Sequence, residues 1–231
     1  MKFNNFMKIL ATAILLCGSC SSETTSGTEP NPPTPVDPPK TYTDSEIVEM
    51  VQKDALKYFW DYAQSNSKLA RERYHTDNPG QDAHVVSTGG SGFGLMTILV
   101  GIKNGYVTRT DAVSRLSTAL NFLQNANRFH GAWPHWMDGN TGNVIPFSTK
   151  DNGGDLVETA FLAQGLICVR EYFKNSTDAT ELAISKKADD LWKGIEWNWY
   201  TQGQNVWYWH WSPNYNFEMN RQLRGFDESL I

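Results

Sequence analysis

Cysteine is scarce in this chain of 231 residues, which contains three cysteines in all. Cys17 and Cys20 lie near the N-terminus, and Cys168 lies within an apolar run. If the N-terminal segment is cleaved off, one cysteine remains in the domain that follows, so no disulfide can form within it. We expect Cys168 to be a buried and inert thiol. The domain must then be stabilised by its hydrophobic core alone.

An excess of positive over negative charge is lacking as well, and so are the common cofactor motifs. The net charge is −5, which gives no basic surface for a nucleic acid. The five histidines show no H-E-x-x-H pattern and have no cysteine partners, so we expect no metal. The segment 89–94, GGSGFG, lacks the Gly-Lys-Ser/Thr ending of a phosphate-binding loop, and no G-x-S-x-G nucleophile elbow is present. We predict no cofactor.

The first 22 residues, MKFNNFMKILATAILLCGSCSS, resemble a lipoprotein signal peptide. Two lysines precede an apolar run at 9–17 that is too short to cross a bilayer. Small residues then precede Cys20, which we predict to be the lipidated cysteine of a lipobox, although Cys17 stands where an aliphatic residue is usual. Ordinary signal-peptidase cleavage is the alternative. Residues 1–20 therefore predict an exported protein, anchored by lipid in the cell envelope, at the outer membrane or in the periplasm.

Residues 21–42 consist mainly of Ser, Thr, Pro and Gly. Such a composition buries too little apolar surface to offset the entropy of ordering the chain. We interpret this segment as a semi-rigid linker. The domain is then expected at 43–231.

Apolar residues at helical spacing predict five helices in this domain. We expect them at 43–64, 92–105, 108–126, 155–173 and 176–197. The second and fourth are apolar on nearly all sides, whereas the third and fifth are amphipathic. Helices of the first kind are buried and those of the second kind face water on one side. This alternation favours an all-α fold, an α/α toroid of inner and outer helices, over the alternative of an irregular helical solenoid.

Small β-hairpins are expected in the loops of the toroid. Residues 137–145, MDGNTGNVI, contain the turn signal Asp138-Gly139. Residues 197–211 suggest a two-stranded ribbon that turns at Gln202-Gly203. Residues 225–231 look like the first turn of a further helix, so we expect about half of a complete toroid in this chain.

Three carboxylates stand at the start of the apolar segment 150–169. Asp155 and Glu158 lie on one face of a first helical turn, and Asp151 lies in the Gly-rich turn before it. Asp155 alone could be a helix cap, with Glu158 completing a capping box. A carboxyl group on a buried helix is costly, however, and burial raises its pKa, as a general acid requires. A structural ion pair of Glu158 with Lys150, Arg221 or Arg224 is the alternative.

Aromatic residues are unusually frequent in the predicted loops. Trp207, Trp209 and Trp211 alternate, which would place three indoles on one face of a strand. Sugars pack their C–H faces on such rings, while carboxylates cleave glycosidic bonds in pairs. Packing of this face on the core is the alternative. Asp227 and Glu228 add further acids near the C-terminal end.

The segments STGGSGFGLMTILVGIKNGYVTR, STKDNGGDLVETAFLAQGL and NFEMNRQLRGFDESLI resemble the glucoamylase-like lipoproteins of Bacteroidetes. That group includes the endo-β-1,2-glucanases of glycoside hydrolase family 144. The resemblance covers residues 43–231 and would correspond to the N-terminal half of such an enzyme. It implies an (α/α)6 barrel and metal-free, inverting hydrolysis of a β-glucan.

The resemblance also implies a set of site residues. Its acidic cleft positions match Asp151, Asp155, Glu158 and Glu228. Together with the aromatic residues above, the substrate-binding residues that we predict are Phe93, Trp133, His135, Trp136, Trp207, Trp209, Trp211, Tyr215, Glu218, Arg221 and Arg224. The expected partner is an oligo- or polysaccharide. The alternative function is that of a non-catalytic glycan-binding lipoprotein in a polysaccharide-uptake system.

Overall fold

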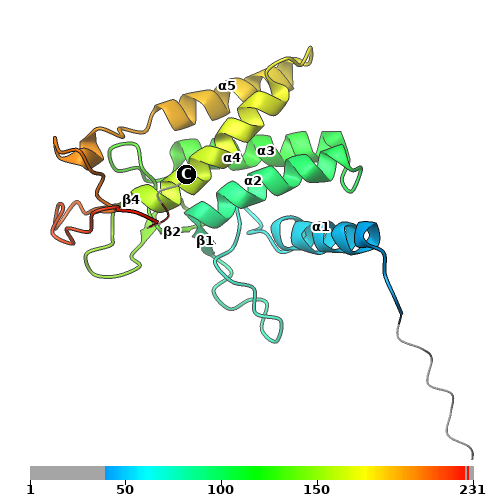
Figure 1. Cartoon of the computed structure of the whole chain (residues 1–231), viewed down its shortest axis with the longest axis horizontal. Helices are drawn as coiled ribbons and strands as arrows, with labels where there is room; N and C mark the ends of the chain where they lie inside the picture. The colour runs from blue at the N-terminus through cyan, green and yellow to red at the C-terminus, as the bar shows by residue number, and fades with distance from the viewer. Residues whose placement is uncertain (1–39, 227, 229–231) are drawn as a thin grey trace, which may run out of the picture. The chain divides into compact units, whose positions relative to one another are not determined.

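The structure is a computed structural model that describes residues 40–226 and residue 228. Five α-helices are the main secondary-structure elements of this part of the chain. They belong to one compact unit that begins at Tyr42. The helices, shown in Figure 1, are α1 (Asp44–Trp60), α2 (Thr88–Lys103), α3 (Arg109–Asn125), α4 (Leu156–Phe173) and α5 (Ala179–Lys193).

Side-chain caps explain where these helices begin. Thr43 forms the predicted capping box with Glu46 at the start of α1, and Thr108 caps α3. The predicted start of the second helix at 92 is wrong. Ser87 accepts a hydrogen bond from the amide of Gly90, and this cap lets α2 begin at Thr88. The helix α2 therefore begins four residues earlier than we expected.

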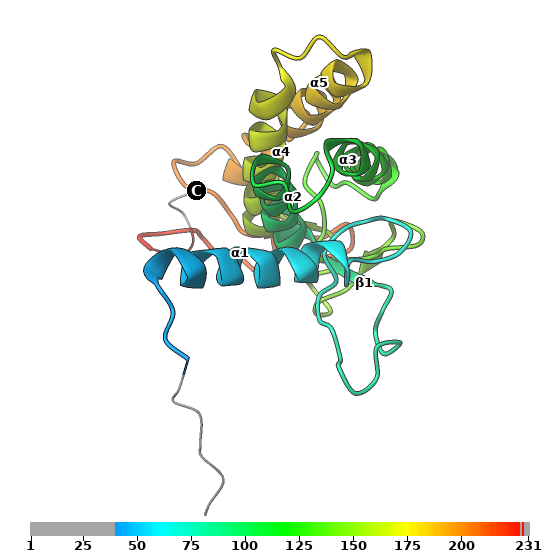
Figure 2. The same ribbon diagram turned by 90° about the vertical axis from the view of Figure 1, so that its right-hand side faces the viewer.

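The two apolar helices lie side by side at the centre of the helical unit. Figure 2 shows α2 and α4 together, with α3 and α5 on the outside. The backbones of α2 and α4 approach so closely at Gly92 that a Cβ there would lie 2.2 Å from the carbonyl oxygen of Phe161. The predicted pairing of inner apolar with outer amphipathic helices is confirmed, and it is consistent with part of a helical toroid.

The core lies between these two layers. Its largest fully buried side chains come from the helices and from the loops that join them, and they include Trp133, Tyr200, Phe173, Leu116, Leu120, Leu162 and Leu166. Cys168 is half-buried against this core and is a free thiol. The aromatic loop residues Trp133 and Tyr200 therefore close the same core that the helices build.

Two small antiparallel sheets connect the helix ends. In the first, β1 (Val85–Ser87) pairs with β2 (Trp136–Asp138), and β2 pairs with β3 (Val144–Ile145). The hairpin predicted around Asp138-Gly139 is thus confirmed. This sheet holds the start of α2 next to the loop that contains His135, because Ser87 lies opposite Trp136.

The second sheet corrects the ribbon predicted at 197–211. Residues Trp199–Thr201 form a short 3₁₀-helix, and β5 (His210–Trp211) pairs with β4 (Gly154–Asp155) instead of with the segment before the turn. The turn itself is present, since Gln202 and Gly203 have φ values of 51° and 72°. The backbone amide of Leu156 donates to the carbonyl of Trp209, which attaches this segment to the start of α4.

Some predictions fall on residues that the structure does not describe. These are the signal peptide and most of the linker, with Cys20 among them, and residues 227 and 229–231 of the turn expected at 225–231. Within the described part of the chain, no helix combines the length and the apolar character needed to cross a membrane.

Candidate active site

Glu158 lies in the first turn of α4 but bonds to the first turn of α2. Its Oε2 accepts hydrogen bonds from the backbone amide of Gly89, at 2.8 Å, and from the hydroxyl of Ser87, at 3.4 Å. Gly89 leaves room for this contact, because a Cβ there would lie 2.6 Å from Oε2. Oε1 makes no hydrogen bond to any residue within 40–226 or to residue 228. The side chain of Glu158 therefore does not bond back to the amide of Asp155, and the capping box that it would have completed is absent.

Asp155 caps α4 and also binds an imidazole. Its Oδ1 accepts a hydrogen bond from the amide of Glu158 at 2.9 Å, which confirms the predicted cap. Its Oδ2 lies 2.8 Å from Nδ1 of His135. The side chain of Asp155 is fully buried. One carboxylate thus fixes both the backbone of Glu158 and the ring of His135.

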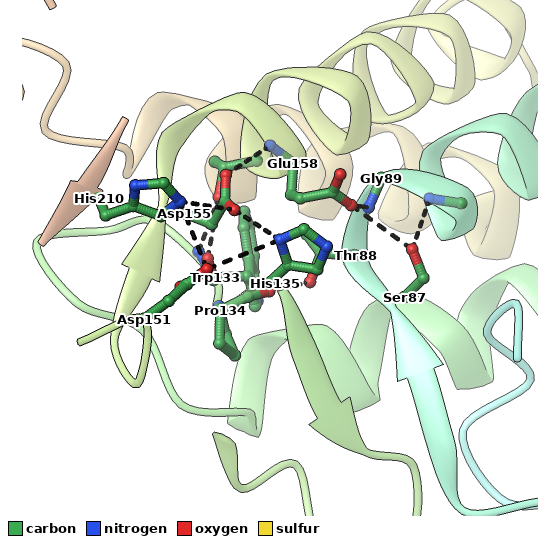
Figure 3. A network of polar contacts seen from close by, with 12 residues as sticks. Ser87, Thr88, Gly89, Trp133, Pro134, His135, Asp151, Asp155, Glu158 and His210 are labelled. Atoms are coloured by element: carbon green, nitrogen blue, oxygen red, sulfur yellow. Dashed lines mark hydrogen bonds and ion pairs between the residues drawn. The ribbon is translucent and has the colours of Figure 1, made fainter. Parts of the chain in front are cut away.

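Two histidines approach two aspartates from opposite sides, as Figure 3 shows. Nδ1 of His135 lies 3.9 Å from Oδ2 of Asp151, beyond its contact with Asp155. Nε2 of His210, on β5, lies 3.3 Å from Oδ2 of Asp151 and 3.7 Å from Oδ2 of Asp155. Buried carboxylates need hydrogen bonds or opposite charge. His135 forms a hydrogen bond with Asp155, and the ring of His210 lies close to both carboxyl groups.

Backbone contacts hold His135 in this place. The amide of Thr88 donates to the carbonyl of His135, and the hydroxyl of Thr88 donates to the carbonyl of Pro134. The amide of Asp155 donates to the carbonyl of Trp133 at 2.9 Å. The loop at 133–135 is therefore attached both to the start of α2 and to the start of α4.

The electrostatics of the site favour a neutral Glu158. Burial raises the pKa of this carboxyl group, and the charge of Asp155 raises it further. The charge of His135 and the amide of Gly89 act in the opposite direction without cancelling the rise. Glu228 adds a smaller rise. A carboxyl group that keeps its proton above its ordinary pKa range can act as a general acid.

The pKa of His135 is raised for a different reason. Burial alone would lower it, but the hydrogen bond to Asp155 and the charges of Asp155, Glu158 and Asp151 outweigh burial. The site therefore combines a carboxyl group and an imidazole whose pKa values are both raised, the first mainly by burial and the second by its carboxylate neighbours.

His135, Asp151 and Asp155 also form the group best suited to hold a cation. Their ligand atoms lie within 4.8 Å of one another. Nitrogen and carboxylate oxygen donors of this kind accept several divalent metals. A bound ion would have to separate His135 from Asp155, whose atoms lie at hydrogen-bonding distance. The absence of a metal stays a prediction.

Aromatic rings surround His135. Phe147, half of whose side chain is exposed (49%), stacks on His135 with ring centres 4.1 Å apart, and Trp136 meets both rings edge-on. Phe93, which is 46% exposed on α2, packs against Phe161 of α4. Phe147 was not among the predicted residues. Sequence reasoning considered the tryptophans of this loop and overlooked Phe147, although it stands four residues before Asp151.

The predicted tryptophans do not share a surface. Trp133 is fully buried and donates its indole N–H to the carbonyl of Leu123, so its prediction as a sugar-binding residue is corrected to a core role. Trp211 meets the stacked pair His130 and Trp199 edge-on. Trp209 stacks on His210. The expected common face of Trp207, Trp209 and Trp211 is absent, because β5 is a strand of only two residues.

Trp207 and Glu228 lie instead around a cavity of about 210 Å³ beside the carboxylates. The walls are mainly apolar side chains of α4, α5 and the C-terminal segment, among them Leu156, Val157, Ile167, Trp192, Trp197 and Leu223. Neither Asp151, Asp155 nor Glu158 contributes to its wall. Glu228 is exposed, and its charge raises the pKa of Glu158 slightly.

The remaining predicted residues lie at the surface. Lys150 forms an ion pair with Glu218 at 2.5 Å, so the alternative pairing of Lys150 with Glu158 is not present. Arg224 donates to the side chain of Gln222, and Arg221 lies over the ring of Trp209. Tyr215 is exposed. The structure therefore brings together Asp151, Asp155, Glu158 and His135, and it leaves these residues outside that group.

His210, Ser87 and Gly89 are the site residues that sequence reasoning missed. His210 stands in an aromatic run, WYWHW, where a single histidine between tryptophans could have signalled a buried polar contact. Ser87, followed by Thr and two glycines, could have been identified as a helix cap. Their contacts with the carboxylates join segments that are far apart in the sequence.

No protein-family model matches the chain. It is 42% identical, over 98% of its length, to the exo β-1,2-glucooligosaccharide sophorohydrolase (non-reducing end) of Parabacteroides distasonis, of which it covers 30%. Among solved structures, it is 51% identical to an endo-β-1,2-glucanase from Chitinophaga pinensis in complex with sophorotriose and glucose. That match has a TM-score of 0.79 and covers 82% of this chain and 46% of that one.

A third relative is also an enzyme that acts on β-1,2-glucan. A β-1,2-glucanase from Parabacteroides distasonis is 44% identical, with a TM-score of 0.75, over 80% of this chain and 26% of its own. The chain is a close homologue of Bacteroidetes β-1,2-glucan hydrolases. It matches their N-terminal half and spans less than half the length of the relatives described here.

Proposed function

We propose that the protein to which this chain belongs hydrolyses β-1,2-glucosidic bonds with Glu158 as general acid. The observation that carries the proposal is the buried carboxyl group of Glu158, whose pKa is raised beside Asp155. The homology to β-1,2-glucan hydrolases supports the same reaction. Glycoside hydrolysis requires such a proton donor together with a second carboxylate.

The proton on Glu158 has a defined position in this mechanism. Oε2 is occupied by the amide of Gly89 and the hydroxyl of Ser87, whereas Oε1 has no hydrogen-bond partner in the described part of the chain. A proton on Oε1 is therefore free to pass to the glycosidic oxygen as the bond breaks. The neutral acid becomes a carboxylate that the amide of Gly89 already stabilises.

Asp151 supplies the second carboxylate in this proposal. Both oxygens of Asp155 are engaged, one by the amide of Glu158 and one by His135. Oδ1 of Asp151 is buried without a hydrogen-bond partner among the described residues. In an inverting reaction this oxygen would orient the attacking water and accept its proton, which requires water to reach it when the substrate binds. The product released first from a β-linkage would then be the α-anomer.

The finer architecture and the location of the protein belong to the same proposal. The pairing of α2 with α4, and of both with outer helices, supports an (α/α)6 barrel whose N-terminal part is formed by 43–231. The sequence of residues 1–20 supports export and lipid attachment at Cys20, with 21–42 as linker. A lipid anchor would place the domain in the cell envelope, where glucan from outside can reach it.

A reducing-end assay with three substrates tests the proposed activity. We expect the purified chain to release sugar from β-1,2-glucan but not from laminarin or starch, with proton NMR showing the α-anomer first. A fusion of the chain to the unmatched part of the Chitinophaga pinensis enzyme serves as the second arm. Release by the fusion alone would mean that the site needs the remainder of a barrel. Release by neither protein, with retention on immobilised β-1,2-glucan, would contradict hydrolysis and favour a glycan-binding role.

A further inference from the structure

Asp151 and Asp155 form a pair of buried carboxyl groups at the centre of the site. Asp155 is fully buried, and Asp151 is 97% buried, with 3% of its surface exposed. No lysine or arginine forms an ion pair with either carboxylate in the described part of the chain. The groups that face them are the imidazoles of His135 and His210. Two carboxylates without any compensating charge would carry a large desolvation cost.

His135 is the imidazole better placed to carry that charge. Its Nδ1 lies 2.8 Å from Asp155, whereas the nearest approach of His210 to either aspartate is 3.3 Å. Phe147 covers one face of the His135 ring, and Trp136 meets its edge. The ring is therefore fixed in orientation by both a hydrogen bond and aromatic packing.

The second nitrogen of His135 is unused within the protein. Nε2 forms no hydrogen bond to any residue that the structure describes, and the side chain is 20% exposed. Figure 3 shows this nitrogen pointing away from the aspartates, on the side where the Glu158 carboxyl group lies. A charged imidazole in this orientation donates one N–H to Asp155. Its second N–H is available to an acceptor group that binds beside Glu158.

We propose that His135 is a positioning residue of the site, an imidazolium that holds Asp155 through Nδ1 and donates its Nε2–H to a hydroxyl group of the bound glucan. The inference rests on the function proposed above. It assigns His135 a charged state and a substrate-facing donor in addition to the contact with Asp155. A sugar hydroxyl group can accept this hydrogen bond. The exposed ring of Phe147 is then available to pack against a C–H face of the same sugar.

The charge on His135 has a consequence for pH dependence. The groups that face His135 are Asp151, Asp155, Glu158 and, through the aspartates, His210. The charge of His135 lowers the pKa of Glu158 against the effects that raise it. Removing the charge while keeping the contact with Asp155 should therefore let Glu158 hold its proton to a higher pH.

The variant His135→Asn separates these roles, because the Asn amide can replace the Nδ1–H but carries neither the charge nor the Nε2–H. We expect kcat/KM on β-1,2-glucooligosaccharides to fall roughly tenfold or more, as for loss of a charged hydrogen bond. We also expect KM to rise and the alkaline limb of the pH profile to move upward. The matched control is His130→Asn, since His130 also pairs with a carboxylate, Glu196, and stacks on Trp199, but contacts none of the four clustered groups.

Nitrogen-15 NMR of the imidazole rings tests the charge without any substrate. We expect His135 to remain doubly protonated at pH values above the ordinary histidine midpoint of about 6.5. A His135 that is neutral at or below that pH, or a His135→Asn profile that superimposes on that of the control, would overturn the proposal. Absence of hydrolysis by both the chain and the fusion would contradict the proposed function, while the NMR result would still decide the charge of His135.

Discussion

At the scale of single residues, Glu158 connects two helices that are far apart in the sequence. Its backbone amide is bonded by Asp155 at the start of α4, and its side chain bonds to the amide of Gly89 at the start of α2. Both helix N-termini favour negative charge, but burial and the nearby carboxylate of Asp155 outweigh them and raise the pKa of Glu158. The position of these acids at the mouth of an apolar helix thus raises the pKa of one of them, Glu158.

The raised pKa of Glu158 predicts the direction of the pH dependence. Hydrolysis should persist above the ordinary carboxyl pKa of 4.5 and fall as the pH rises through the raised pKa, because Glu158 then loses the proton it must donate. The folded state also binds this proton more tightly than the unfolded state does. Stability contributed by Glu158 should therefore be present below the unfolded pKa and lost as the pH rises through the folded one.

Thermal melts over a pH series check this linkage against Glu158→Gln, which has no proton to lose. The melting temperature of the native chain should fall relative to that of the variant as the pH rises from about 4.5. A constant difference between the two melting temperatures would contradict a raised pKa in the folded state.

Gly89→Ala should damage the site with little effect on the fold. The new Cβ would lie 2.6 Å from Oε2 of Glu158, so the carboxyl group must move away from the amide that binds it. We expect hydrolysis to fall by roughly 10- to 100-fold. Alanine is favoured over glycine in a helix by up to about 1 kcal/mol, so the melting temperature should change little.

The matched control is Gly90→Ala, one residue further along α2. There the nearest atom to a new Cβ is Oγ of Ser87 at 3.2 Å, and Glu158 is not among its neighbours. Equal loss of activity in both variants would show that the damage arises from the helix turn rather than from displacement of Glu158.

At the scale of elements, the crossing of α2 and α4 determines where the carboxylates lie. The contact is made by backbone at Gly92 and Gly165, which lie against each other. This close approach brings the start of α2 within hydrogen-bonding reach of Glu158. The site therefore depends on a glycine contact away from the chemistry itself.

Gly92→Ala should destabilise the whole unit. Its Cβ would lie 2.2 Å from the carbonyl oxygen of Phe161, which is backbone and cannot swing away, so the helices must separate. We expect a loss of about 3 kcal/mol in the free energy of unfolding, measured by urea denaturation. Gly80→Ala, where the nearest atom lies 3.9 Å away, should leave that free energy nearly unchanged and provides the comparison.

Helices were predictable from the sequence because their signals are local. The apolar spacing and the caps Thr43, Thr108 and Asp155 gave four of the five helix starts to within a few residues. The pairing of β5 with β4 was not predictable, because two-residue strands carry no period and are held by contacts with distant segments. For the same reason Asp151, Asp155, Glu158 and His135 could be proposed from residue type, whereas the contact of Gly89 with Glu158 could not.

At the scale of the whole molecule, the chain provides less than half of the length of its relatives. Apolar side chains remain exposed on α1, at Ile47, Val48 and Val51, and around the cavity beside α4 and α5. The carboxylate cluster is nevertheless assembled from elements within residues 87–210. The central polar contacts of the site thus form within this part of the sequence.

The proposed lipid anchor is testable in cells. Cys20→Ala should abolish metabolic labelling with palmitate and move the protein from the membrane fraction to the soluble fraction, because a diacylated cysteine is the attachment we propose. Cys17→Ala, three residues earlier, is the control and should keep its label. Labelling that depends on Cys17, or on neither cysteine, would contradict the assignment of Cys20.

The most direct test of the central claim compares Glu158→Gln with Glu196→Gln in the same reducing-end assay on β-1,2-glucan. Glu196 is an exposed carboxylate paired with His130, so its variant controls for the loss of one acid from the chain. The variants are made in the form that hydrolyses β-1,2-glucan, either the chain alone or its fusion. Glu158→Gln should lower kcat at least about 100-fold while the thermal melt remains cooperative. Glu196→Gln should match the unmodified protein. Near-full activity of Glu158→Gln would contradict its role as the general acid.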